Sequence, residues 1–193
     1  MKDERNKNIK QSSSQGAGGI IFLIGMMGSG KSYWAQQIAA ATNFNWMDLD
    51  AEIEKENSIT IKEIFETEGE AAFRIKEKKA LHKLAEYNNI IIATGGGTPC
   101  FFDNMTWMNA HGTTIFINEP VSILVQRLQN EKAKRPLISQ SSNESFQRLL
   151  VDKLAERLPF YSQAKHSITG SLASVTDFLK IINGSDEKRL SVL

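Results

Sequence analysis

Short apolar runs alternate along the chain with longer segments in which apolar residues recur every three or four positions. Five of the short runs predict strands, at 20–24, 44–49, 90–93, 113–117 and 166–169. The first run, IIFLI, is apolar at every position, which is typical of a strand covered on both faces. Helical periodicity fills the intervals at 31–42, 60–66, 69–87, 103–110, 121–131, 144–157 and 174–183. This alternation predicts a three-layer α/β fold, with a parallel sheet between helices on both faces.

Both ends of the chain lack this pattern. Residues 1–19 are polar and finish in QSSSQGAGG, so we expect a flexible tail there and a single domain over 20–183. Residues 184–193 are expected to form a second loose end. Inside the domain, the polar stretch 131–143, EKAKRPLISQSSN, breaks the pattern. It predicts either an ordinary surface loop or a mobile lid.

The composition excludes several classes of function. Hydrophobic residues make up 41% and charged residues 23% of the chain, and the net charge is +1. Such a charge gives no global field that would attract nucleic acid or an anionic membrane. Cys100 is the single cysteine, which excludes an intrachain disulfide framework and fits a reducing compartment. We therefore expect a cytoplasmic monomer that binds neither nucleic acid nor a membrane.

The segment GMMGSGKS, from Gly25 to Ser32, indicates a phosphate-binding loop. It follows a predicted buried strand and precedes a predicted helix, which is the context this motif requires. Its glycines let backbone N–H groups turn toward phosphate oxygens, and Lys31 is expected to reach the β- and γ-phosphates. The Ser32 hydroxyl is expected to ligate Mg²⁺. We expect ATP to contact Gly28, Ser29, Gly30, Lys31, Ser32 and Tyr33.

Other features narrow the class of phosphate-loop protein. A GTPase needs an Asn-Lys-x-Asp motif after a later strand, and the only Asn-Lys pair lies in the N-terminal tail. Asp48 and Asp50 lie at the end of the second predicted strand. In an extended segment, two such carboxylates point the same way, ~6.5–7 Å apart. One can hold the metal, directly or through water, while the other accepts a proton from a hydroxyl.

Three consecutive glycines, Gly95, Gly96 and Gly97, follow the third predicted strand. Because glycine has no side chain, such a segment lets the backbone approach a ligand closely. Together with the phosphate loop and the two acids, it favours a kinase for a small alcohol.

Six motifs follow one another along the chain: GMMGSGKS, the Asp48-Leu49-Asp50 pair, GEAAFR at 69–74, ATGGG at 93–97, KRPL at 134–137 and ERLPFY at 156–161. In these motifs and in their order, the chain resembles the shikimate kinases. The resemblance covers about residues 20–183. It implies a nucleoside-monophosphate-kinase-like fold with five parallel strands and a lid. It also implies Mg²⁺-dependent transfer from ATP to the 3-hydroxyl of shikimate, on the route to chorismate and the aromatic amino acids.

The resemblance assigns the acceptor side of the site. It implies that Arg74 and Arg157 bind the shikimate carboxylate, a task for which the planar guanidinium fork is suited. Gly95, Gly96 and Gly97 are expected to contact the acceptor. Asp50 is expected to bind the ring hydroxyls and is the candidate base.

On the nucleotide side, the resemblance implies that Asp48 supports Mg²⁺ through water. Arg135, in the 131–143 loop, is expected to move over the phosphates and act in catalysis together with Lys31 and Asp50. Arg127 matches a position that packs on adenine in the family. The segment GSLAS at 170–174 departs from some relatives, since it lacks a basic residue near the adenine.

Two alternatives stay open. One is a kinase of another small hydroxy acid, such as gluconate. The other is a nucleotide-binding module that no longer transfers phosphate. Lys31, Asp50 and Arg135 are all present, which favours an active kinase.

Overall fold

The computed structural model describes residues 19–130 and 143–184. Along the chain the elements are β1 (Ile20–Ile24), α1 (Lys31–Ala40), β2 (Asn45–Asp48), α2 (Leu49–Asn57), α3 (Ile61–Thr67), α4 (Gly69–Lys83), β3 (Ile90–Ala93), α5 (Asn104–His111), β4 (Gly112–Ile117), α6 (Val121–Asn130), α7 (Asn143–Tyr161), β5 (His166–Ile168) and α8 (Val175–Ile182). The predicted tails, 1–19 and 184–193, and the predicted lid, 131–143 with Arg135, lie outside the described residues, apart from their terminal positions Gly19, Gly184 and Asn143.

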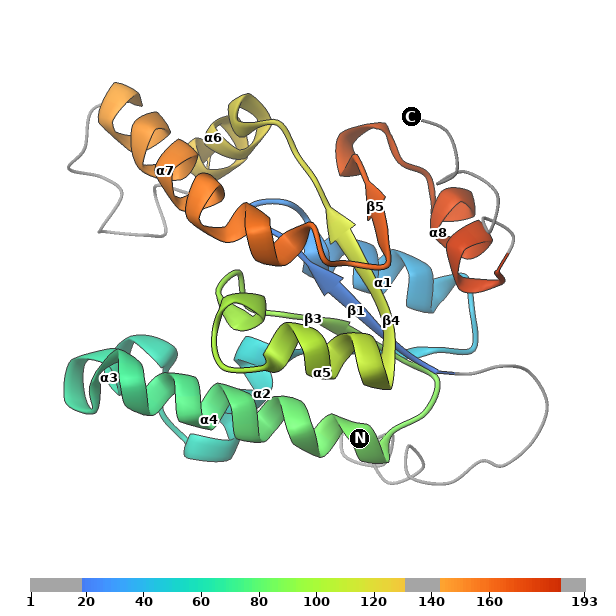
Figure 1. The fold of residues 1–193 in the computed structure, drawn as a ribbon, viewed down its shortest axis with the longest axis horizontal. Coiled ribbons are helices and arrows are strands. Elements are labelled where there is room, and N and C mark those ends of the chain that lie inside the picture. The colour runs from blue at the N-terminus through green and yellow to red at the C-terminus, as the bar shows by residue number, and fades with distance from the viewer. Residues whose placement is uncertain (1–18, 131–142, 185–193) are drawn as a thin grey trace.

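The sheet has five parallel strands in the order β2-β3-β1-β4-β5 (Figure 1). Its central strand, β1, pairs with β3 and β4, so that Ile20 lies opposite both Ile90 and Gly112. Parallel neighbours need long crossovers, and helices supply them here. The carboxyl ends of β1, β2 and β3 therefore meet at one edge, where the phosphate-binding loop, the acids and the three glycines follow. The predicted three-layer α/β fold is confirmed.

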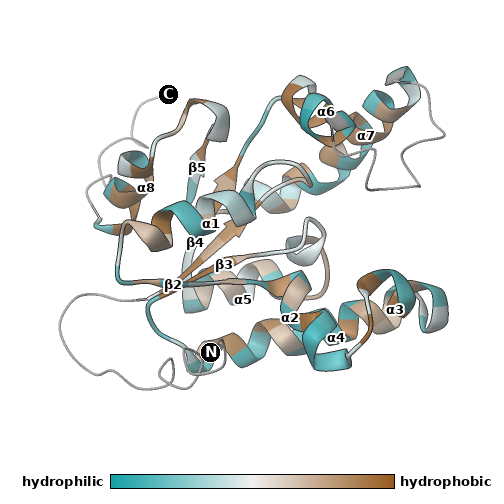
Figure 2. Ribbon diagram, turned by 180° about the vertical axis from the view of Figure 1, so that it is seen from behind, coloured by the Kyte–Doolittle hydropathy of each residue, from teal (hydrophilic) through white to brown (hydrophobic). Residues whose placement is uncertain are grey.

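Each face of the sheet has its own apolar core. Ile20, Phe22 and Ile24 face one core, and Ile21 and Leu23 face the other, because successive side chains of a strand point in opposite directions. The first core packs against helices from α2 to α7, and the second against α1 and α8. Figure 2 shows hydrophobic residues along the strands, with hydrophilic residues on the outer sides of α3 and α4. These two cores hold rigid the strands that carry the site.

One predicted boundary is wrong in a way that matters for the site. The expected strand 44–49 ends at Asp48, and a helix that the periodicity did not predict, α2, begins at Leu49. Asp48 is the N-cap of this helix, and Asp50 lies in its first turn. The two acids therefore do not share an extended segment. They flank a strand-to-helix junction, and the geometry expected from strand spacing does not apply.

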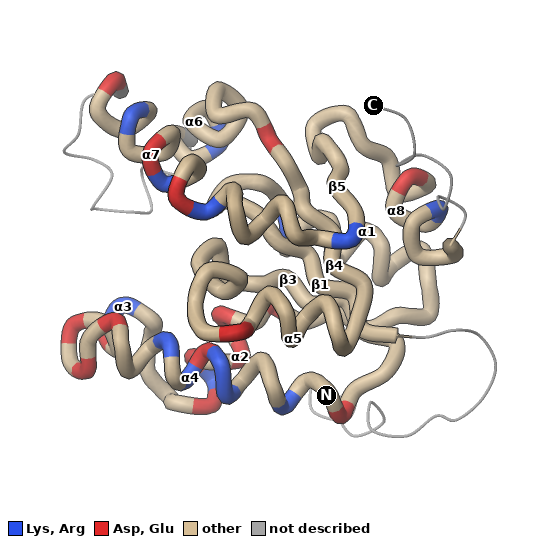
Figure 3. Tube along the Cα trace, in the orientation of Figure 1, with Lys and Arg blue, Asp and Glu red and all other residues tan. Residues whose placement is uncertain are grey.

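Charges on the described surface are of both signs. Acidic and basic residues intermix along α3, α4 and α7 (Figure 3). Within the described residues, no helix is long and apolar enough to cross a membrane.

Candidate active site

The phosphate-binding loop connects β1 to α1 with its glycines in left-handed conformations. Gly28 has φ 77° and Gly30 has φ 91°, backbone angles that residues with a Cβ rarely adopt. Gly30 is the N-cap of α1, and no side chain caps the helix there. The first N–H groups of α1 are thus left for another acceptor, at the end of the helix that carries partial positive charge. This arrangement suits a phosphate group.

Lys31 is buried at the start of α1, and its ammonium group points back into the loop. Its Nζ donates to the carbonyl oxygens of Gly25 and Met26, each at 2.9 Å. Burial lowers the pKa of Lys31 to about 8, although the nearby carboxylates of Asp50 and Asp48 oppose the shift. A phosphate group entering the loop would supply the negative charge that this desolvated ammonium lacks.

Asp48 connects the loop to the second strand. The Ser32 hydroxyl donates to Asp48 Oδ2 at 2.6 Å, while Asp48 Oδ1 accepts from the backbone N–H of Asp50 at 3.1 Å. The described residues hold no cluster of three or more His, Cys, Asp or Glu that could bind a metal. One carboxylate beside one hydroxyl instead fits Mg²⁺, which keeps several waters and shares its other ligands with phosphates.

Asp50 is the second acid of this group, and its environment differs from that of Asp48. Burial is the main cause that raises the pKa of Asp50 to about 6, and the neighbouring carboxylates of Asp48 and Glu77 contribute to the same shift. Lys31 and Arg74 act in the opposite direction. A carboxylate with a raised pKa in a pocket is suited to accepting a proton near neutral pH.

The three consecutive glycines each face a charged side chain of the predicted site. A Cβ on Gly95 would lie 2.7 Å from Asp50 Oδ1. One on Gly96 would lie 3.0 Å from an Arg157 nitrogen, and one on Gly97 would lie 2.7 Å from an Arg74 nitrogen. Glycine is therefore required here because it lets three charged groups, distant in sequence, approach one backbone segment.

Arg74 is buried on α4 and held by two acids. Its Nη1 donates to Glu77 at 2.9 Å, and its Nη2 donates to Glu70 at 3.0 Å. The guanidinium carbon lies 4.0 Å from the centre of the Phe101 ring. Glu77 is fully buried and also accepts from the Thr98 hydroxyl at 2.6 Å. In sequence, the charged run KEKK at 76–79 looks like a solvated helix face, but Glu77 is buried and orients the Arg74 guanidinium.

Arg157 and Tyr161 approach the same loop from α7. Arg157 Nη1 lies 3.9 Å from the Met26 sulfur, and Tyr161 donates a hydrogen bond to the Gly96 carbonyl. Tyr161 is fully buried. The end of α7 thus contacts both the phosphate-binding loop and the three glycines. Arg157 and Arg74 approach adjacent glycines, Gly96 and Gly97.

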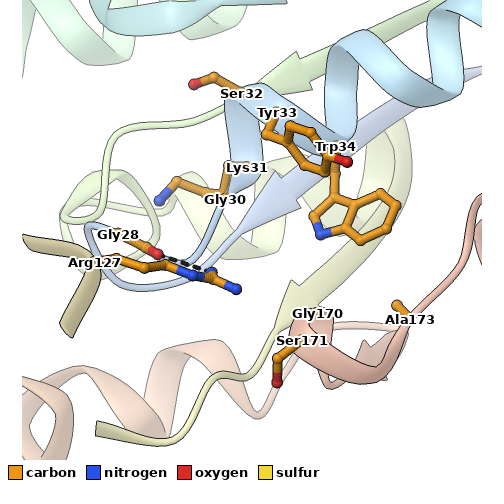
Figure 4. Close-up of a pocket in the computed structure, with 10 residues that line it drawn as sticks. All are labelled: Gly28, Gly30, Lys31, Ser32, Tyr33, Trp34, Arg127, Gly170, Ser171 and Ala173. Carbon is orange, nitrogen blue, oxygen red and sulfur yellow. Dashed lines mark hydrogen bonds between the residues drawn. The ribbon is translucent and has the colours of Figure 1, made fainter. Parts of the chain in front are cut away.

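A pocket of about 830 Å³ opens on the other side of the phosphate-binding loop (Figure 4). Residues of the loop and of α1 line it together with Arg127 from α6 and the segment after β5: Gly28, Gly30, Lys31, Ser32, Tyr33, Trp34, Arg127, Gly170, Ser171 and Ala173. Tyr33 is 58% exposed and packs edge-on against Trp34. From the segment after β5, Gly170, Ser171 and Ala173 offer the pocket backbone and small side chains, without the basic residue that some relatives carry. Of the expected nucleotide ligands, Arg135 lies outside the described residues.

A family model described as "Shikimate kinase" matches residues 27–183. The chain belongs to the shikimate kinase family. It is 43% identical over 146 residues to a shikimate kinase from Phocaeicola vulgatus. The aligned residues cover 76% of this chain and 83% of that relative. Members of the family are phosphotransferases that use ATP and Mg²⁺.

Solved structures agree with this assignment. The crystal structure of the Bacteroides thetaiotaomicron shikimate kinase has a TM-score of 0.79 and 36% identity, over 89% of this chain and 98% of the other. The Acinetobacter baumannii shikimate kinase, solved in complex with shikimate, has a TM-score of 0.77 and 30% identity, over 88% and 96% of the two chains. The fold and the family expected from the sequence are confirmed.

Proposed function

We propose that this chain transfers the γ-phosphoryl group of ATP to the 3-hydroxyl of shikimate, giving shikimate 3-phosphate. Family membership supports the reaction class. The observation that carries the proposal is the meeting of Asp50, Arg157 and Arg74 at Gly95, Gly96 and Gly97, respectively. A base and two guanidinium forks around one loop match an acceptor that has both a hydroxyl and a carboxylate.

In the transfer step, Asp50 takes the proton of the acceptor hydroxyl. The hydroxyl oxygen forms a bond to the γ-phosphorus while the bond from that phosphorus to the bridging oxygen of ADP breaks. The raised pKa of Asp50, about 6, leaves the carboxylate ionised at neutral pH yet basic enough to accept the proton. ADP leaves with the electron pair of the broken bond.

Arg74 and Arg157 hold the carboxylate of the acceptor. Two acids already occupy Arg74, but they differ in exposure: the Glu70 side chain is 56% exposed, whereas Glu77 is fully buried. We expect the acceptor carboxylate to replace Glu70 at Arg74. Breaking the exposed Glu70–Arg74 ion pair costs little, because the Glu70 carboxylate returns to water. Glu77 stays in place and keeps the guanidinium plane oriented.

The nucleotide side of the site consists of Gly28, Ser29, Gly30, Lys31, Ser32 and Tyr33. Ser32 and Asp48 would hold Mg²⁺. The metal would supply charge neutralisation on the phosphate oxygens. Lys31 would leave the carbonyls of Gly25 and Met26 and follow the charge that develops on the transferring group.

Arg135 remains a proposal from the sequence: it is expected to deliver positive charge to the phosphates. A fall in kcat without weaker acceptor binding in Arg135→Ala would support this role, and an unchanged kcat would remove it. We also propose that the chain works as a monomer in the cytoplasm, a reducing compartment that its single cysteine fits. Size-exclusion chromatography with light scattering would test the monomer.

The experiment that tests the assigned roles separates chemistry from acceptor binding. Lys31→Ala should reduce kcat by roughly 10²–10³, as expected for loss of a preorganised charge. Arg74→Ala should mainly raise the KM for shikimate, because a contact made already in the ground state is lost. An unchanged shikimate KM in Arg74→Ala would contradict the carboxylate assignment.

A further inference from the structure

Glu119 is a buried acid that none of the roles above uses. It lies two residues beyond β4 and is 3% exposed. Neither of its carboxylate oxygens has a hydrogen-bond partner among the described residues. Its one close charged neighbour in that part of the chain is Arg127, whose Nη2 lies 3.1 Å from Oε1, close enough for an ion pair but without hydrogen-bond geometry.

A carboxylate in such a place is costly. Taking a charge out of water has to be offset by its partner, and a contact without good hydrogen bonds offsets it poorly. A neutral or apolar residue would cost less at this position. The free-energy cost of burying the Glu119 carboxylate therefore suggests that its charge acts on Arg127.

Arg127 is held at two atoms of its guanidinium group. Its Nη1 donates to the Gly28 carbonyl at 3.1 Å, and its Nη2 meets Glu119. Figure 4 shows the side chain reaching into the pocket beside Gly28, with Ser171 on the far side. These two contacts restrain the guanidinium along its edge, while the side chain is 38% exposed and lines the pocket.

The floor of the pocket is shaped around Glu119. A Cβ on Gly170 would lie 2.8 Å from Glu119 Oε1 and 3.2 Å from the indole nitrogen of Trp34. Glycine at 170 therefore lets the backbone of the pocket floor close over the carboxylate. Glu119 is 3% exposed and is not among the residues that line the pocket, whereas its neighbour Arg127 is.

We propose that Glu119 is a positioning residue that fixes Arg127 as a flat stacking surface for the nucleotide base. The inference rests on the expected role of Arg127 at the adenine and extends it. By balancing the charge of Arg127, Glu119 also keeps this guanidinium from turning toward the phosphates. The loop residues and Lys31 are then left to bind the triphosphate, and Arg127 acts on the base.

The test compares Glu119→Gln with a matched control, Glu66→Gln, on the exposed side of α3. Two quantities are measured: the KM for ATP, and the inhibition constant of inorganic tripolyphosphate, which has phosphates but no base. Glu119→Gln should raise the KM for ATP about 3- to 30-fold, the factor that corresponds to a cation–π contact. It should leave kcat and tripolyphosphate inhibition unchanged, and Glu66→Gln should change nothing.

Other results would overturn the proposal. Equal weakening of ATP and tripolyphosphate would mean that Glu119 only supports the fold of the loop. Weakening of tripolyphosphate alone would make Arg127 a phosphate ligand. An unchanged KM for ATP would show that Glu119 does not position Arg127.

A double-mutant cycle separates this inference from the role of Arg127 itself. If Glu119 acts through Arg127, then Glu119→Gln should have no further effect on the KM for ATP in an Arg127→Ala background. A normal KM in Arg127→Ala alone would refute the adenine role. If the KM for ATP were raised in Arg127→Ala but normal in Glu119→Gln, only the inference about Glu119 would be refuted.

A second variant guards against misfolding. Glu119→Asp keeps the charge, but its side chain is one methylene shorter, so the carboxylate lies farther from Arg127 Nη2. It should also raise the KM for ATP while sparing tripolyphosphate inhibition. A normal KM for ATP in a folded Glu119→Asp enzyme would contradict the proposal.

Discussion

The Ser32 hydroxyl donates a 2.6 Å hydrogen bond to the carboxylate of Asp48. This bond joins the first turn of α1 to the end of β2 and places two oxygen ligands of the kind Mg²⁺ prefers beside the phosphate-binding loop. Asp48→Asn should weaken the apparent affinity for Mg²⁺ by about 10- to 100-fold, as for other groups that orient a metal site. A titration of activity against free Mg²⁺ at fixed ATP measures this.

Asp152→Asn, on the exposed side of α7, is the control for loss of one negative charge. Its Mg²⁺ titration should match that of the unmodified enzyme. An Asp48→Asn enzyme with the same Mg²⁺ dependence as the control would place the metal elsewhere.

The raised pKa of Asp50 predicts the pH dependence of the reaction. At saturating ATP, kcat/KM for shikimate should rise with pH and level off above about 6, because Asp50 must be ionised to accept the hydroxyl proton. Asp50→Asn should lose nearly all activity at every pH. A profile that stays flat between about pH 5 and about pH 8 would mean that the carboxylate does not act as the base.

The same pKa predicts a stability effect of opposite sign to the activity effect. Because burial raises the pKa of Asp50 from 3.8 to about 6, the folded state binds this proton more tightly than the unfolded state. The stability from this group is present below the unfolded pKa and is lost as pH rises through the folded pKa.

Asp50→Asn should therefore raise Tm at pH 7 by several degrees, since each kcal/mol corresponds to about 2–4 °C for a chain of this size. The gain should shrink toward zero at about pH 3, below the unfolded pKa of 3.8, where Asp50 is protonated in both states. Calorimetry at the two pH values would reveal the difference. A lower Tm for the variant at pH 7 would contradict the assigned burial penalty.

The close approach of Arg74 to Gly97 gives a fourth prediction. A Cβ at residue 97 would lie 2.7 Å from Arg74 Nη2, so Gly97→Ala should push the guanidinium away from its two acids. The shikimate KM should rise at least several-fold, while the KM for ATP changes little.

Gly19→Ala is the matched control, because a Cβ there meets nothing within 4 Å. Steady-state kinetics with each substrate varied in turn measures both constants. If Gly97→Ala raised the KM for ATP as much as that for shikimate, Gly97 would not belong to the acceptor side alone.

The strands and the phosphate-binding loop could be predicted because their signals are local. A run such as IIFLI specifies a buried strand by itself, and the spacing from Gly25 to Ser32 specifies the loop. The helix α2 could not be predicted in the same way. Its sequence, LDAEIEKEN, buries only Leu49 and Ile53, and its start depends on the cap that Asp48 provides.

Glu77 and Glu119 were missed because their burial comes from partners elsewhere in the fold. Glu77 lies in a run of charged residues that looks solvated, and only the spacing of three from Arg74 hinted at an ion pair. Glu119 has no local signal, because Arg127 and Gly170 reach it from two other segments. The triple glycine was correctly linked to close approach, but the charged groups it admits became clear only in three dimensions.

The most direct test of the account is the rate of ADP formation with a panel of acceptors. Shikimate, gluconate and nucleoside monophosphates would each be offered at saturating ATP and Mg²⁺, with Lys31→Ala as the control for background hydrolysis. We predict Mg²⁺-dependent ADP formation with shikimate, accompanied by shikimate 3-phosphate, well above the rate with any other acceptor. A faster rate with gluconate or a nucleotide, or a rate that does not depend on the acceptor, would contradict the assignment.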